Sequence, residues 1–498
     1  MLRITPLFLL LFYPFFNFIS FNQYPWISSE VLVLLLSAFC LAVLGSFVFA
    51  EAAGFFLFLL ITGGPVAVNP TGIFLRAGIC LVVIFFLHLL KKRAPIVVLI
   101  FIVGAGVTEF FIPGPQPSFS EKTPLQASNK IRGNVLYIIL DEHIGIDGMP
   151  PNVSATPLMQ KKLTDFYLNH NFTLYPKAYS PYFYTDNAVP NALNGTFESI
   201  QGFYFKGVKR KLEKNRLFER YFKEGYRIYS YAPTYIDYCT DKVFKCTSYP
   251  ENSPVVILGE GYGVGDRLLM LTALYSITNS VFHEIQKRIP EKFFLIRMGP
   301  LKTVPSLFRE LKKDIQESKG DALFFAHVLM PHSPYVYDAQ CQPKPLSGWL
   351  SRKEFNERDR KNSEEGYRKR YAAYYEQMEC VHLLLADLFE FLKKRGEFDS
   401  TTIFVHGDHG SRIILDYEPY FDFAQKISRQ DMLSSHSALL AVKLPGQKGA
   451  INPSQGSLPA ILNAVFDNKP FEGEAESFVL MKQKKGKKAL VRHPMPPL

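Results

Sequence analysis

NVLYIILDE, residues 134–142, is the stretch that decides the fold of this chain. Its apolar run, Val135–Leu140, shows no polar alternation, which is typical of a strand whose two faces are both covered by helices. In open α/β sheets, ligands bind at the carboxyl ends of the strands. Asp141 and Glu142 follow this strand directly, so we expect them to lie where the chemistry takes place.

Strand-like and helix-like segments alternate through the rest of residues 131–498. This alternation predicts one α/β domain with a largely parallel central sheet. The strands are expected at Phe172–Tyr179, Tyr226–Tyr231, Ala322–Val328, Thr401–Val405 and Ala438–Lys443, and the helices at Thr156–Asn169, 208–224 and Arg352–Lys394.

The first 113 residues have a different composition, with only five basic and three acidic side chains. Five apolar stretches of membrane-spanning length can be drawn in them, at about 5–21, 31–49, 53–69, 73–90 and 94–112. We therefore predict a transmembrane helical bundle over 1–113, with four spans as the alternative. A Pro- and Ser-rich linker over 114–130 follows it, and the catalytic domain covers 131–498.

Lys91, Lys92 and Arg93 form a basic cluster between two of these stretches. The positive-inside rule places this cluster in the cytoplasm, so a fifth span puts everything after residue 113 outside. We expect a multi-pass inner-membrane protein with a periplasmic catalytic domain; a cytoplasmic domain is the alternative. The chain carries a net charge of +11, mostly in this domain. With a membrane anchor, anionic lipid or substrate explains that charge better than nucleic acid does.

Four cysteines lie in the predicted exported domain: Cys239, Cys246, Cys341 and Cys380. An even number in an oxidising compartment favours two disulfides. Cys239 and Cys246 bracket a short polar loop, which favours their pairing and leaves Cys341 with Cys380. This is one of three possible connectivities, and free thiols or a metal site are the alternatives.

Polar side chains follow three of the predicted strands. Asp141 and Glu142 end the first, His327 and His332 lie around the end of Ala322–Val328, and Asp408 and His409 follow Thr401–Val405. Carboxylates with a neighbouring imidazole suit a divalent metal bound by oxygen and nitrogen ligands. The sequence therefore predicts a metal centre at this edge of the sheet.

Four segments together resemble the sulfatase-like branch of the alkaline phosphatase superfamily: Asn134–Glu142, Thr185–Gly195, His327–Tyr335 and 407–410. With its predicted membrane anchor, the chain resembles in particular the phosphoethanolamine transferases and lipoteichoic acid synthases of that branch. The resemblance implies a phospho-alcohol headgroup moved from a membrane lipid to an envelope glycan or lipid.

The resemblance also implies roles for individual residues. Thr185 matches the nucleophile and a metal ligand, and Asp141, Asp408 and His409 match further metal ligands. His332 would contact the transition state or act as an acid, and His327 and His436 would contact substrate. A metal is needed because a hydroxyl is a poor nucleophile unless its pKa is lowered. Zn²⁺ and Mn²⁺ both suit these ligands, in one site or two.

Some positions depart from the family patterns. Glu142 is a further ligand or points away from the metal, and His436 could instead lie in a surface loop. Sulfatases need a formylglycine made from Cys or Ser in a Cys/Ser-x-Pro-x-Arg context, which the sequence around Thr185 lacks. The alternatives to a transferase are a phosphodiesterase or phosphatase, less favourably a sulfatase, and an inactive membrane scaffold.

Overall fold

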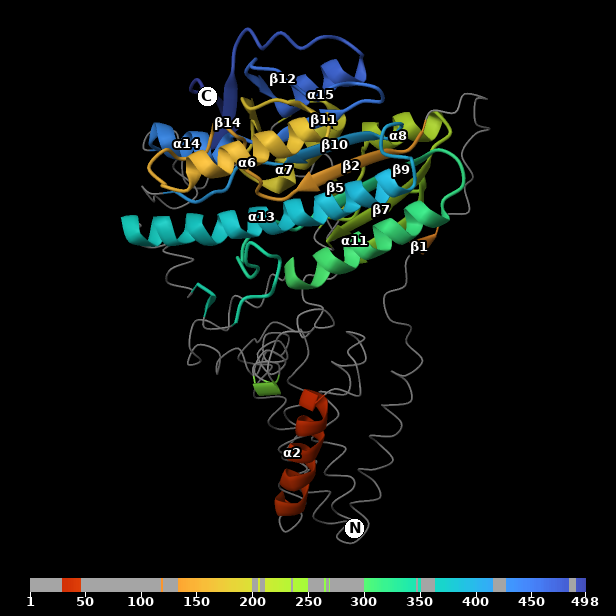
Figure 1. The fold of residues 1–498 in the computed structure, drawn as a ribbon, viewed down its shortest axis with the longest axis vertical. Helices are drawn as coiled ribbons and strands as arrows, with labels where there is room; N and C mark the ends of the chain where they lie inside the picture. The colour runs from red at the N-terminus through yellow and green to blue at the C-terminus, as the bar shows by residue number, and fades with distance from the viewer. Residues whose placement is uncertain are drawn as a thin grey trace. The chain divides into compact units, whose positions relative to one another are not determined.

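The opening strand is β2 (Val135–Leu140), and it occupies the middle of a nine-stranded sheet in this computed structural model. All six of its residues are buried, as its unbroken apolar run predicts. The order of the described strands is β1-β8-β7-β9-β2-β10-β11-β3-β12, so strands from distant parts of the chain are neighbours (Figure 1).

The structure describes residues 29–45, 118–119, 133–198, 205–206, 211–233, 236–249, 264–265, 268, 300–345, 348–350, 363–414, 427–482 and 490–498. The chain divides into two compact units, one of residues 1–116 and 252–302 and one of residues 117–251 and 303–498. The sheet belongs to the second unit. The predicted domain boundaries at 113 and 131 stay predictions.

The five central strands run parallel, which confirms the largely parallel sheet. They are β8 (Val243–Tyr249), β7 (Arg227–Pro233), β9 (Ala322–Val328), β2 and β10 (Thr402–Gly407). The outer pairings of β1 (Ser118–Phe119) with β8, and of β11 (Leu440–Lys443) with β10 and β3 (Thr173–Leu174), are antiparallel, whereas β12 (Ala450–Ile451) runs parallel to β3.

The register of the pairing makes β9, β2 and β10 end at the same edge of the sheet. Leu140 of β2 pairs with Gly407 of β10 on one side and with Val328 of β9 on the other. The residues that follow these three positions therefore emerge together at one edge of the sheet.

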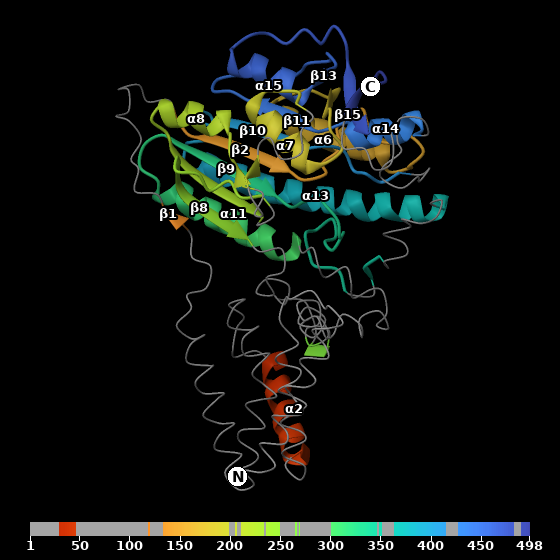
Figure 2. The ribbon, with the colours of Figure 1, turned by 180° about the vertical axis from the view of Figure 1, so that it is seen from behind.

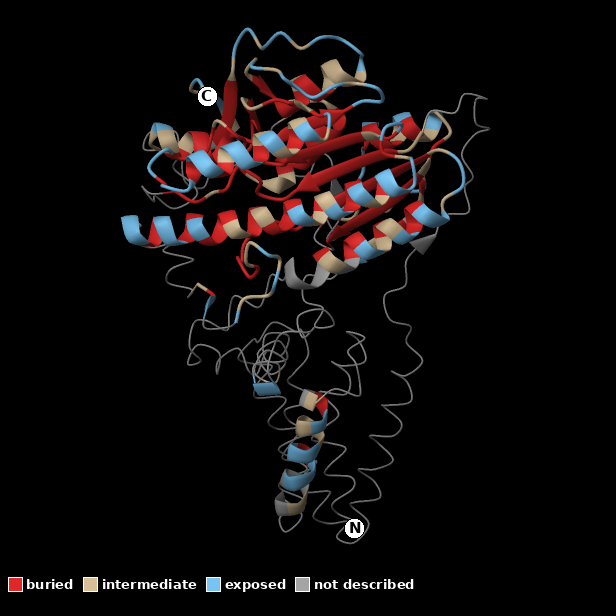
Figure 3. Cartoon of the chain, in the orientation of Figure 1, coloured by how far each residue is buried: buried red, intermediate tan, exposed pale blue. Residues whose placement is uncertain are grey.

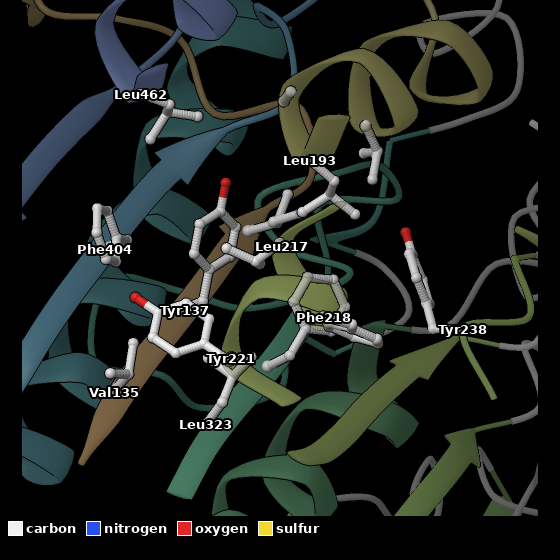
Figure 4. Packing of buried hydrophobic residues seen from close by; sticks show 14 of the residues in the cluster. Val135, Tyr137, Leu193, Leu217, Phe218, Tyr221, Tyr238, Leu323, Phe404 and Leu462 are labelled. Carbon is white, nitrogen blue, oxygen red and sulfur yellow. The ribbon is translucent and has the colours of Figure 1, made fainter. Parts of the chain in front are cut away.

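Helices cover both faces of the sheet, as Figures 1 and 2 show. One face carries α6 (Thr156–Asn169), α11 (Pro300–Glu317) and α13 (Glu364–Lys394), and the other carries α7 (Thr185–Asn194), α8 (Arg216–Lys223) and α15 (Leu458–Phe466). The helices alternate between buried and exposed positions while the strands between them are buried (Figure 3). Apolar residues of β2, β9 and β10 pack with α7, α8 and α15 in one cluster (Figure 4).

Short elements complete the second unit. They are β4 (Ala178–Tyr179) with β13 (Gly456–Ser457), β5 (Phe205–Lys206) with β6 (Lys211–Leu212), the hairpin of β14 (Phe478–Lys482) and β15 (Leu490–Pro494), and α14 (Arg429–His436).

Long, uniform sequence patterns predict the elements well. The observed bounds of β2, β9 and α6 equal the predicted ones, and those of β7, β10 and β11 differ from them by at most two residues. The long helix predicted from Arg352 is described from Glu364 onward as α13, and its residues 352–362 lie outside the described part.

Two predicted elements are wrong. The single strand expected at Phe172–Tyr179 is two short strands, β3 and β4, because Pro176 has no N–H for a ladder and the chain turns there through a bond from Ala178 N–H to the Tyr175 carbonyl. The helix expected at 208–224 begins only at Arg216. Asn215 caps it by accepting a hydrogen bond from Phe218 N–H, and Lys211–Leu212, within the predicted range, form β6 instead.

In the first unit, the structure describes α2 (Ser29–Gly45), which overlaps the second predicted span. None of the helices among the described residues is both long and apolar enough to cross a membrane. The other four predicted spans lie outside the described residues, and so does the predicted linker apart from its residues 118–119, which form β1. The transmembrane bundle stays a prediction.

Both predicted disulfides are confirmed. Cys239 pairs with Cys246, with their Cα atoms 5.6 Å apart, and Cys341 pairs with Cys380 at 4.4 Å. The first closes the loop that leads into β8, and the second joins the segment after β9 to α13.

Lys443, the last residue of β11, is almost fully buried. Its ammonium donates hydrogen bonds to the carbonyls of Phe398, Asp399 and Thr401, at 2.7, 3.3 and 3.2 Å. These carbonyls belong to the segment that leads into β10, so Lys443 fixes the start of the strand that later supplies Asp408.

We predict that Lys443→Met destabilises the protein by about 2 kcal/mol, because hydrogen bonds to a charged donor are lost and buried carbonyls are left unpaired. The measurement is thermal unfolding of the full chain in detergent followed by circular dichroism. Lys448→Met, at an exposed position a few residues on, is the control and should leave the midpoint unchanged. Equal midpoints for both variants would contradict the prediction.

Candidate active site

Asp141, Asp408 and His409 meet at the carboxyl ends of β2 and β10. Each offers one ligand atom, and these atoms all lie within 4.8 Å of one another. The three side chains are buried, with at most 1% of their surface exposed. The strand register explains the meeting, because Asp141 and Asp408 are the residues that follow the paired Leu140 and Gly407.

The electrostatics of this cluster call for a cation. Burial raises the pKa of Asp408, His409 acts to lower it and the negative charge of Asp141 acts to raise it, and the resulting pKa is about 6. Burial also acts to raise the pKa of Asp141, but His332 and the hydrogen bond from His327 outweigh it and hold the pKa below its usual value. Two ionised carboxylates this close repel each other, and a positive charge between them would stabilise the ionised pair.

The hydrogen bond of one ring nitrogen of His409 places the lone pair of the ring on the other nitrogen, which faces the cluster. His409 Nδ1 lies 2.9 Å from the Gly410 carbonyl, which can only accept, so Nδ1 carries the hydrogen. The lone pair is therefore on Nε2, which faces Asp408 Oδ2 at 3.2 Å. Two carboxylates and this imidazole form a donor set that fits Zn²⁺ or Mn²⁺.

Thr185 begins α7 and reaches the same cluster. Its hydroxyl oxygen lies 3.3 Å from His409 Nε2. The helix begins here because Tyr184 before it is extended. The positive end of the helix dipole favours negative charge at this position, as a deprotonated hydroxyl or a bound phosphate would carry. The geometry thus joins the nucleophile and the metal ligands that the resemblance implies.

Glu142 turns away from the three ligand candidates. Its φ of +63° lies in the left-handed region, and its carboxylate contacts the Arg412 guanidinium and lies 3.5 Å from His332 Nε2. Its backbone N–H nevertheless donates to Asp408 Oδ1 at 2.9 Å. Glu142 therefore belongs, by its side chain, to a second group of residues beside the metal cluster.

This second group consists of Glu142, His332 and Arg412, and we call it the charged rim. His332 and Arg412 expose 13% and 18% of their side chains, in contrast to the buried ligand candidates. The sequence prediction missed Arg412. Its position three residues after His409 offered a signal, because a cation so close to a metal motif is in reach of an anionic substrate.

His327 and His436 occupy different places. His327, near the end of β9, lies with Nε2 3.4 Å from Asp141 Oδ2. His436 ends α14 and is fully buried, which excludes the surface loop. Its Nδ1 donates to the Ser180 carbonyl at 3.0 Å, and its Nε2 has no hydrogen-bond partner among the described residues. Burial lowers the pKa of His436 to about 4, so this ring is neutral and its Nε2 can accept.

The helix α13 holds the loops that carry these residues, through side chains three positions apart. Tyr371 hydroxyl lies 2.9 Å from Ser411 Oγ after β10, and Tyr374 hydroxyl donates to the Glu142 carbonyl after β2 at 2.6 Å. Gln377 Nε2 donates to the His332 carbonyl after β9 at 2.7 Å. One face of this helix thus contacts all three strand-end loops, and sequence reasoning did not foresee it.

The fold resembles that of several solved enzymes at low sequence identity. The phosphonate monoester hydrolase of Agrobacterium radiobacter is 14% identical, over 70% of this chain and 80% of that chain, with a TM-score of 0.41. BT4656 in complex with D-glucosamine-2-N,6-O-disulfate is 10% identical, over 72% and 86%, with a TM-score of 0.45. The C-terminal periplasmic domain of EptC from Escherichia coli, in complex with zinc, is 10% identical, over 76% and 96%, with a TM-score of 0.42.

Among curated proteins, none matches this sequence significantly. The family description Sulfatase matches residues 133–440, which contain β2, the Thr185 helix, the His332 loop and the Asp408–His409 pair. This match covers more than half of the chain, and the chain belongs to the sulfatase family of the alkaline phosphatase superfamily.

Proposed function

We propose that this chain is a membrane-anchored, metal-dependent transferase that moves a phospho-alcohol headgroup, of the phosphoethanolamine or phosphoglycerol type, from a lipid to an envelope glycan or lipid. The observation that carries this proposal is the Thr185 hydroxyl at the start of α7, 3.3 Å from Nε2 of His409 and beside two buried carboxylates.

The nucleophile is Thr185. Asp141, Asp408 and His409 would hold a Zn²⁺ or Mn²⁺ ion, and such an ion lowers the pKa of a nearby hydroxyl and stabilises negative charge on phosphoryl oxygens. The Thr185 oxygen attacks phosphorus, the bond from phosphorus to the lipid oxygen breaks, and the lipid alcohol leaves with a proton. The product on the enzyme is a phosphodiester of Thr185 and the headgroup alcohol.

The charged rim contains the residue to which we assign proton transfer, His332. Nδ1 of His332 lies 2.5 Å from the Ser333 carbonyl and so carries a hydrogen, and its Nε2 faces Glu142 and Arg412. We assign proton transfer to the leaving alcohol, and later from the acceptor alcohol, to His332 Nε2. An acceptor hydroxyl then attacks the same phosphorus and restores Thr185.

Transfer of a phosphoryl group fits this site better than hydrolysis of a sulfate ester. A formylglycine is an aldehyde, made by oxidising the primary Cβ of Cys or Ser. Thr185 carries a methyl group on that carbon, so its oxidation gives a ketone instead. Family membership indicates the fold and a dependence on metal, whereas Thr185 favours transfer of a phosphoryl group over hydrolysis of a sulfate ester.

A phosphodiesterase or phosphatase is the second candidate. The partial exposure of His332 favours it, because a base that solvent reaches can activate water as well as an alcohol. An inactive scaffold is disfavoured, since the nucleophile and all three ligand candidates are present and lie together.

The proposed location is the periplasmic side of the inner membrane. The disulfides Cys239–Cys246 and Cys341–Cys380 support an oxidising compartment. The apolar stretches before residue 113 and the basic cluster at 91–93 support an anchor that leaves the site outside, near lipid headgroups.

We predict that Thr185→Ala lowers turnover by about a thousandfold or more, because the covalent step is lost. Incubation of the purified full chain with a fluorescent phosphoethanolamine lipid, followed by mass spectrometry of the peptide with residue 185, detects the intermediate. Thr185→Ser keeps a hydroxyl and should still form it. Turnover by Thr185→Ala at the wild-type rate would contradict the assignment, and product formed without any acceptor alcohol would favour the hydrolase.

We also predict that the purified protein holds Zn²⁺ or Mn²⁺ and loses turnover on dialysis against a chelator, with recovery on adding the metal back. Asp408→Asn should lose the bound metal because one anionic ligand is gone. Elemental analysis by plasma mass spectrometry gives the metal content. Asp399→Asn, at an exposed site before β10, is the matched control. Full activity in metal-free wild-type protein would refute this prediction.

A further inference from the structure

A line of three buried side chains runs from the segment between β7 and β8 to the candidate metal ligand Asp141. Tyr238 hydroxyl lies 3.0 Å from His327 Nδ1, and His327 Nε2 lies 3.4 Å from Asp141 Oδ2. All three residues expose at most 1% of their surface. The proposed chemistry assigns no role to Tyr238, which in Figure 4 stands at the edge of the apolar cluster.

The line has a defined hydrogen-bond direction. Asp141 in its ionised form can only accept, so His327 must present a hydrogen on Nε2. In the neutral ring Nδ1 is then an acceptor, and the Tyr238 hydroxyl must donate to it. Burial and the nearby charge of Asp141 raise the pKa of Tyr238 well above its usual value, so this hydroxyl keeps its hydrogen. Tyr238 therefore selects the tautomer of His327 that supports Asp141.

The Tyr238 segment is itself held firmly. The next residue, Cys239, is joined by a disulfide to Cys246 in β8. Asp237, the residue before, accepts a hydrogen bond from Leu212 N–H on its carbonyl and one from Cys239 N–H on its carboxylate. The ring of Tyr238 also packs against Phe325 of β9, two residues before His327, with centroids 4.9 Å apart. The hydroxyl is thus fixed relative to the strand that carries His327.

We propose that Tyr238 is a positioning residue of the metal centre: its hydroxyl orients His327, and His327 orients the Asp141 carboxylate toward a divalent cation. This inference rests on the proposed role of Asp141 as a metal ligand. Mutation of a residue that orients a metal ligand without contacting the metal typically lowers metal affinity about 10–100-fold. Tyr238 acts one contact further away, so we expect the lower end, about tenfold.

The test measures Zn²⁺ affinity of the full chain in detergent by competition with a chromophoric chelator. Tyr238→Phe removes only the hydroxyl and should weaken Zn²⁺ binding about tenfold. Tyr375→Phe is the matched control, because it also removes a buried tyrosine hydrogen bond, 2.8 Å long, to Thr156 on α6. This control should leave the Zn²⁺ affinity unchanged.

A double-mutant cycle then asks whether Tyr238 acts through His327. In a chain that already carries His327→Leu, adding Tyr238→Phe should weaken Zn²⁺ binding no further. Equal affinities of wild type and Tyr238→Phe would overturn the inference, whatever happens to the unfolding midpoint. So would a full tenfold loss that persists in the His327→Leu background. If the wild-type chain binds no divalent ion, the proposed metal site and this inference both fail. If the wild type binds Zn²⁺ and Tyr238→Phe binds it equally well, only this inference fails.

Discussion

Two carboxylates buried side by side, Asp141 and Asp408, are the constraint on which the rest of the site depends. Parallel pairing of β2 and β10 places them there, and each would be costly to bury ionised without compensation. Part of that compensation is visible as hydrogen bonds, since Asp408 Oδ1 accepts from the backbone N–H groups of Glu142 and His409 at 2.9 Å each. The remaining negative charge is what a divalent ion would balance.

These hydrogen bonds form only if the loops around the cluster keep a fixed geometry. The helix α13 holds those loops in place. Tyr371, Tyr374, Gln377 and Cys380 follow one another at intervals of three residues, and each is bonded to a segment that follows a central strand. Side chains three positions apart are neighbours on a helix surface, so these four follow a strip that winds around the helix. The same helix thus covers the sheet and fixes the three strand ends against one another.

The sequence predicted the frame of the site better than its interior. Nearly continuous apolar runs specify buried strands by themselves, so β2 and β9 were located to the residue. The strand-end pattern alone indicated Asp141, Asp408 and His409, whereas Thr185 depended on family resemblance because a threonine before a short helix carries no signal of its own. Arg412, Tyr238 and Gln377 were missed, since their roles arise from contacts between segments about 40 to 270 residues apart.

Glu142 contacts the metal cluster through its backbone N–H, whereas its carboxylate belongs to the charged rim. Strand alternation predicts that consecutive acids face opposite ways, and the Glu142 side chain does point away from the metal cluster. The cause is different, because Glu142 lies beyond the strand and its positive φ turns its side chain toward Arg412. With its carboxylate committed to a guanidinium, Glu142 adds no negative charge to the metal cluster. With a divalent ion bound, the donor set of two carboxylates and one neutral imidazole is electrically neutral. The deprotonated Thr185 oxygen would be a further ligand and would bring the net charge to −1. A cationic Arg412 beside this arrangement is suited to the anionic phosphodiester that the proposed reaction consumes.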